Sequence, residues 1–141
     1  MTLALVAIFL LGIVTGLRAF TAVAVLWLMR HGGPWAIVLA VLAVAEYAGD
    51  LYPKAPARTS ASGLIARIVV GGFVGWSLAL ASNVAGVEGA LVGAAGALVG
   101  AYGGLAVRLR AMARVGAVPA ALLEDAVAVS IAVFAVSRTM Q

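Results

Sequence analysis

The sequence predicts an all-α integral membrane protein, a compact bundle of about five transmembrane helices with close Gly/Ala-rich packing. Of its 141 residues, 65% are hydrophobic and only 10% are charged, and the mean hydropathy is +1.19. A soluble domain carries about 25% charged residues, so this chain cannot cover a water-exposed surface. Its apolar runs are continuous rather than alternating, which favours helices over barrel strands. We expect a single membrane domain over residues 1–141.

Each expected span is an apolar run of roughly 20 residues, the length that a helix needs to cross the hydrocarbon core. Four polar or helix-breaking stretches separate the runs: RHGGP at 30–34, PKAPARTSAS at 53–62, SNVAG at 82–86 and RLRAMARVGAVP at 108–119. The five expected spans cover residues 2–29, 35–52, 63–82, 87–107 and 120–136.

Specific residues decide how the first span is interpreted and where the second span ends. The first run is too long for a secretory signal peptide and no basic segment precedes it. The second ends at Pro53, because proline lacks the N–H donor and restricts the residue before it.

The basic residues predict the orientation of the chain. Five spans would place the termini on opposite sides, and cytoplasmic loops carry an excess of Lys and Arg. The second–third and fourth–fifth connections share one side and hold Lys54, Arg58, Arg67, Arg108, Arg110 and Arg114, whereas the other side holds Arg30 and Arg138. We therefore expect a multi-pass inner-membrane protein with a cytoplasmic N-terminus and a C-terminus outside. A broken first helix or a re-entrant segment would change the number of spans and is the alternative.

One internal repeat, GALVGAA followed by GALVGAY, occupies residues 89–102. It places five glycines on one helix stripe: Gly89, Gly93, Gly96, Gly100 and Gly103. Such stripes let helix backbones approach closely in lipid. The stripe could be a gating seam, but static close packing, within one chain or between protomers of a homo-oligomer, is the commoner use.

Seven charged residues lie inside or beside the expected spans, towards the inner half of the membrane: Arg18, Glu46, Asp50, Arg67, Arg108, Glu124 and Asp125. One charge at the bilayer centre costs about 2.5–3.5 kcal/mol on insertion scales. These side chains must therefore face the bundle interior, and we expect the acids to pair with arginines, above all with Arg18. An inert ion network that fixes helix register is one interpretation. A solute or ion pathway is the one we favour for the set.

Catalytic and cofactor motifs are not evident. The sequence contains no GxSxG, HExxH or P-loop pattern and no cysteine, so we expect neither an enzyme nor a cofactor. Four carboxylates could hold a hard cation, but the neighbouring arginines would compete with it, so we expect no metal site. The arginines flank apolar runs as topology signals do, and no basic patch indicates nucleic acid.

Five motifs spread over most of the chain resemble one family of small, multi-spanning bacterial membrane proteins. They are TGLRAF at 15–20, E-x-x-x-D-x-x-P-K-x-P-x-R-T at 46–59, AR at 66–67, GAxGAxxGAYGG at 93–104 ending at Arg108, and ALLEDAVAV at 121–129. The chain resembles the family catalogued as domain of unknown function 4126. The resemblance implies a multi-pass inner-membrane protein and no particular activity, and it highlights the same charged positions.

The charged cluster predicts a small transporter or channel for an unidentified small solute or ion. Arg18 would contact an anionic group or neutralise a carboxylate, and the four acids would line an inward-facing vestibule and could carry coupling protons. The alternative is a non-transporting accessory protein that binds membrane lipids or a membrane partner through the basic connections at 54–67 and 108–114. An intramembrane enzyme ranks last, since no nucleophile or ligand set is recognisable.

Overall fold

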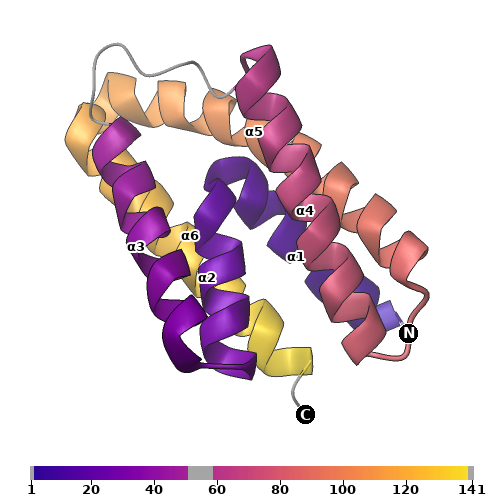
Figure 1. Ribbon diagram of the computed structural model, residues 1–141. Coiled ribbons are helices and arrows are strands. Elements are labelled where there is room, and N and C mark those ends of the chain that lie inside the picture. Colours follow the sequence, from indigo (N-terminus) through magenta and orange to yellow (C-terminus); the bar gives the residue numbers. More distant parts are fainter. Residues whose placement is uncertain (1, 51–58, 140–141) are drawn as a thin grey trace.

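The computed structural model describes residues 2–50 and 59–139, and these residues form six α-helices and no strands (Figure 1). The helices are α1 (Thr2–Leu17), α2 (Ala19–Arg30), α3 (Gly33–Asp50), α4 (Ala61–Ala81), α5 (Gly86–Val115) and α6 (Ala117–Thr139). The predicted all-helical class is confirmed for these residues, whereas the count of about five membrane-crossing helices is not confirmed.

Three of these helices are long and apolar enough to cross a membrane: α4, α5 and α6, with 21, 30 and 23 residues. Large hydrophobic side chains cover much of the outer surface, among them Trp35, Ile37 and Val44 on α3. A surface of this kind is what a helix bundle in lipid presents. The structure is therefore consistent with a membrane location.

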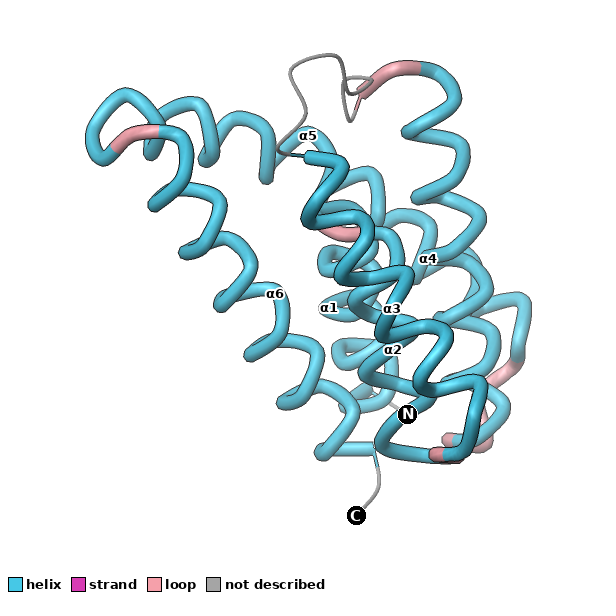
Figure 2. The backbone as a smooth tube through the Cα atoms, turned by 60° about the vertical axis from the view of Figure 1, so that its left-hand side comes forward, coloured by secondary structure: helices cyan, strands magenta, loops and turns pink. Residues whose placement is uncertain are grey.

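The expected first span, 2–29, is not one helix. Arg18 has an extended backbone, with φ −144° and ψ 110°, and it separates α1 from α2. Figure 1 shows the chain reversing at this point, and Figure 2 places the break at mid-height inside the bundle. At 1.5 Å per residue α1 and α2 are about 24 Å and 18 Å long, short of the ~30 Å hydrocarbon core. They form a hairpin that enters the bundle and returns.

This hairpin changes where the chain ends lie. The start of α1 and the end of α6 are at the same end of the molecule, together with the turns at 31–32 and 82–85 (Figures 1 and 2). The end of α3 and the α5–α6 turn are at the opposite end. The expectation of termini on opposite sides rested on a continuous first span, which the break at Arg18 removes.

The expected connection at 108–119 is also mostly helical. Helix α5 continues to Val115, because Arg, Leu, Ala and Met are all strong helix formers. It ends at Gly116, whose φ of +89° suits glycine far better than any other residue. Helix α6 then begins at Ala117, three residues earlier than expected.

Helix α1 lies at the centre of the bundle and packs on α4, α5 and α6. Its Ile8, Leu11 and Val14 are fully buried. Helix α5 lies against both α1 and α4 through its glycines: a Cβ at Gly93 would meet the carbonyl oxygen of Gly71, and a Cβ at Gly12 would meet that of Gly93.

The other stripe glycines differ in what they face. A Cβ at Gly89 would strike α4, and one at Gly96 or Gly100 would strike the backbone of α1, whereas one at Gly103 would meet open space.

Candidate functional site

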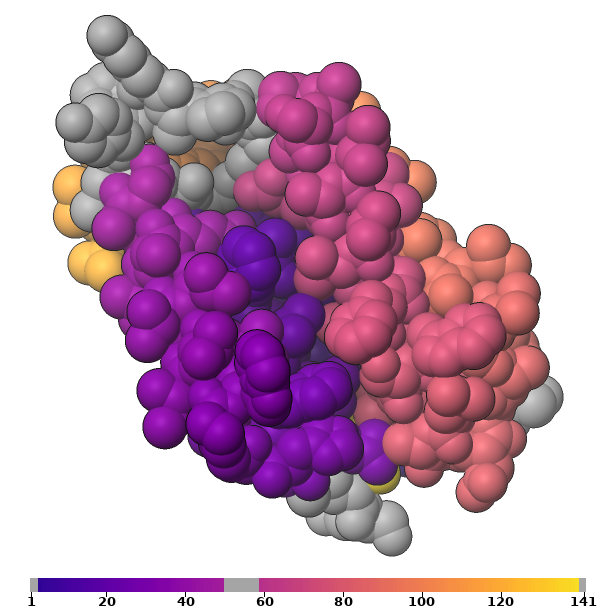
Figure 3. Space-filling model, in the orientation of Figure 1, coloured from indigo at the N-terminus to yellow at the C-terminus, as the bar shows by residue number. Residues whose placement is uncertain are grey.

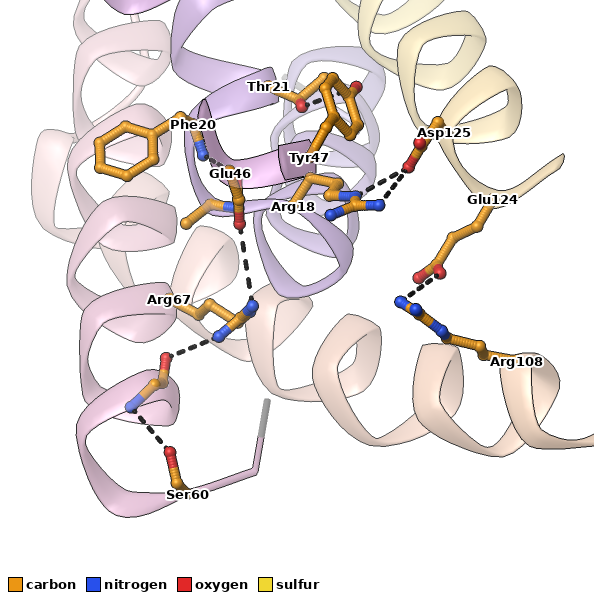
Figure 4. A network of polar contacts seen from close by, with 12 residues as sticks. Arg18, Phe20, Thr21, Glu46, Tyr47, Ser60, Arg67, Arg108, Glu124 and Asp125 are labelled. Carbon is orange, nitrogen blue, oxygen red and sulfur yellow. Dashed lines mark hydrogen bonds and ion pairs between the residues drawn. The ribbon is translucent and has the colours of Figure 1, made fainter. Parts of the chain in front are cut away.

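Arg18, at the break between α1 and α2, is the most deeply buried charged side chain among those described, with 1% of its surface exposed. Its Nε donates a hydrogen bond to Oδ1 of Asp125 on α6 at 2.8 Å, and its Nη2 lies 2.6 Å from the same oxygen (Figure 4). The guanidinium carbon lies 4.5 Å from the ring centroid of Tyr47, a cation–π distance. The expected acidic partner of Arg18 is therefore Asp125.

Glu46 of α3 caps the start of α2, on the other side of the break. The backbone N–H groups of Ala19 and Phe20, the first two residues of α2, donate to its Oε1 and Oε2 at 2.8 and 3.0 Å. The first N–H groups of a helix have no partner within it and carry partial positive charge, so a carboxylate suits this position. Arg18, the residue at the helix start, makes no such cap with its own side chain. Glu46, on another helix, thus supplies the capping acceptor that Arg18 does not provide.

Arg67 extends this contact to α4. Its Nη2 lies 3.8 Å from Oε1 of Glu46, and its Nη1 donates to the carbonyl oxygen of Gly63 at 3.1 Å (Figure 4). The Arg67 side chain is largely buried. Glu46 consequently joins the hairpin to both α3 and α4.

Arg108 and Glu124 form a separate pair between α5 and α6, with Nη1 and Oε2 3.5 Å apart (Figure 4). The neighbours Glu124 and Asp125 therefore serve different partners, one on α5 and one at the hairpin break. Asp50 is the last residue of α3, but its side chain lies outside the described part of the structure.

Tyr47 is a site residue that the sequence did not single out. Its ring lies beside the Arg18 guanidinium, and its hydroxyl is 3.3 Å from Oγ1 of Thr21. Its position directly after Glu46 could have indicated a place in the site, since adjacent residues of one helix lie at the same level of the bundle.

The molecular surface is hollowed on one face. Figure 3 shows this hollow between α3 and α4, with residues of the α1–α2 hairpin at its floor. Within residues 2–50 and 59–139, no group of three or more His, Cys, Asp or Glu side chains is placed to hold a metal ion. What the site offers is guanidinium donors, carboxylate acceptors and a helix start that Glu46 caps, a set suited to binding charged groups.

Comparisons with protein-family models, with curated proteins and with solved structures found no match to this chain. The resemblance to domain of unknown function 4126 therefore stays a hypothesis.

Proposed function

We propose that this chain is a small membrane transporter or channel for a small solute or ion, which passes beside the break at Arg18. One observation carries the proposal: a helix is interrupted inside the bundle, and charged side chains from α3, α4 and α6 converge on the interruption. Irregular backbone at membrane depth is tolerated where protein or a wet cavity surrounds it. Broken helices and buried charges of this kind are typical of solute and ion sites in transporters.

The roles of the residues follow from their contacts. Glu46 fixes the hairpin, because both of its oxygens accept backbone N–H groups. Arg18 and Arg67 supply the donors that a carboxylate or phosphate group of a solute would use. The Arg67–Glu46 contact, at 3.8 Å, is longer than the Arg18–Asp125 contact and is the easier one for a solute to displace. Since one chain of this size barely encloses an aqueous path, we propose a homo-oligomer.

The hairpin also leads to a proposed topology. Helices α3 to α6 cross the membrane, α1 and α2 enter and return, and both chain ends lie outside the cytoplasm. The exposed arginines near the end of α5, Arg110 and Arg114, then face the cytoplasm, as the positive-inside rule requires.

This topology predicts which positions share a side of the membrane. The chain has no cysteine, so single cysteines can be introduced without background. On intact cells, an impermeant maleimide is expected to label Thr2→Cys and Thr139→Cys but not Ala113→Cys, which becomes reactive only after permeabilisation. Labelling of positions 2 and 139 from opposite sides would instead support five continuous spans.

Transport is tested by flux into proteoliposomes across an imposed pH gradient, with a panel of small anions, cations and neutral solutes. Wild type is expected to show solute-specific flux, and Arg18→Gln is expected to lose it, because the charged donor at the break is gone. Arg138→Gln is the matched control, since Arg138 is an exposed arginine at the end of α6. No flux by folded wild type over the whole panel, or full flux by folded Arg18→Gln, would exclude this pathway.

An accessory protein that binds lipid is the second candidate. The exposed arginines near the end of α5, Arg110 and Arg114, favour it, because basic residues at the cytoplasmic surface attract anionic lipid.

A further inference from the structure

A groove runs along the molecule where α5 diverges from α1 and α6. Its volume is about 480 Å³, within the range of roughly 300–1,000 Å³ that small-molecule sites occupy. The lining is almost entirely apolar: Ile13 and Leu17 come from α1, Val107 from α5, and Leu123 and Val127 from α6. Among the described residues, the charged members of the lining are Arg108 and Glu124, which pair with each other.

Basic residues follow the groove-lining residues along α5. Gly103 and Val107 line the groove, and Arg110 and Arg114 follow at spacings of three and four residues, which places all four on one face of the helix. Arg110 and Arg114 are exposed. A Cβ at Gly103 would meet no atom within 4 Å, so the glycine leaves the groove open at that level. Along one face of α5, the open apolar groove is therefore followed by two exposed arginines.

We propose that this groove binds one anionic phospholipid, with an acyl chain along Gly103 and Val107 and the phosphate at Arg110 and Arg114. The apolar lining offers no partner for water, so hydrocarbon is the occupant that a bilayer supplies. The arginines complement an anionic headgroup, and such residues attract anionic lipid by about 1 kcal/mol each near the membrane surface. Arg108 already faces Glu124, so the headgroup preference comes from the two arginines beyond it.

The headgroup half of the proposal is tested by native mass spectrometry of delipidated protein in mild detergent. The probes are phosphatidylglycerol and phosphatidylcholine with the same acyl chains, and glycerol phosphate, which has no acyl chain. We expect phosphatidylglycerol to bind more tightly than phosphatidylcholine. We expect glycerol phosphate not to displace the bound phosphatidylglycerol. Arg110→Gln and Arg114→Gln are each expected to weaken the phosphatidylglycerol complex about fivefold, whereas Arg138→Gln leaves it unchanged. Equal binding of the two lipids, or displacement by glycerol phosphate, would overturn the proposal.

The acyl-chain half is tested with two matched glycine variants. Gly103→Leu fills the groove, whereas Gly49→Leu adds the same side chain at an exposed glycine of α3 that also has nothing within 4 Å. Gly103→Leu is expected to lose the bound lipid while keeping the fold, and Gly49→Leu is expected to keep both. Retained lipid in Gly103→Leu would overturn the proposal, and so would conversion of a dimer to a monomer with lipid binding unchanged, which would assign the groove to a second copy. Lipid binding here needs no transport, so the two proposals can fail separately.

Discussion

Glu46→Ala is expected to unfold or misassemble the hairpin, with the largest loss of stability of any single removal of charge. The substitution leaves the N–H groups of Ala19 and Phe20 without their acceptor inside the bundle. Leaving a buried donor unpaired costs about 1–3 kcal/mol, so the two together cost about 2–6 kcal/mol. The measurement is thermal unfolding of purified protein in mild detergent, followed by size-exclusion chromatography.

Two further variants separate the cap from a general effect of charge. Glu46→Gln keeps one acceptor oxygen, so its stability is expected to lie between those of wild type and Glu46→Ala. Glu88→Ala removes an exposed acid from the first turn of α5 and is expected to cost no more than about 1 kcal/mol, the usual worth of an exposed charge near a helix end. If Glu46→Ala is no less stable than Glu88→Ala, the carboxylate does not hold the break.

Gly93→Leu is expected to prevent the close approach of α1, α4 and α5. Gly93 is a position at which α5 lies against both neighbours. A Cβ added at Gly93 would meet the carbonyl oxygen of Gly71 on α4, and a Cβ added at Gly12 on α1 would meet the carbonyl oxygen of Gly93. Backbone atoms cannot move aside as the end of a flexible side chain can. Overpacking typically costs about 1–3 kcal/mol, and more where backbones must separate. The expected result is aggregated or poorly folded protein after detergent extraction.

The matched control for this variant is Gly103→Leu, ten residues further along the same helix. It adds the same volume and the same helix propensity, but it projects into open space. We expect it to elute as wild type does. Similar behaviour of the two variants, whether both tolerated or both aggregated, would contradict the packing shown by the structure.

The pairing of Arg18 with an acid could be predicted from the sequence, because a lone arginine in an apolar run has few tolerable surroundings. The choice of Asp125 over Glu46 could not, since both were expected at the same level of the membrane. It depends on how the helices turn about their axes, and adjacent acids such as Glu124 and Asp125 can face different neighbours.

The place of the break could not be predicted from the sequence, for a physical reason. Residues 15–20, TGLRAF, include no proline, and leucine, arginine and alanine are good helix formers. What replaces the lost helical hydrogen bonds is Glu46, 27 residues further along the chain in its contact with Ala19. Local propensity carries no information about such a partner. The expected first helix over residues 2–29 is interrupted at this point, and the expectation of termini on opposite sides rested on that helix.

The Arg18–Asp125 contact also has a consequence for how the chain is made. The two residues are 107 positions apart, and the arginine is synthesised first. At ~5–20 residues per second, the ribosome needs about 5–20 s to supply the aspartate. During that time the nascent hairpin carries an arginine that its own segment cannot neutralise, and in the proposed topology an isolated charge at that depth is costly. The hairpin is therefore translated before its acidic partner, and we expect it to reach its final position only after α6 has emerged.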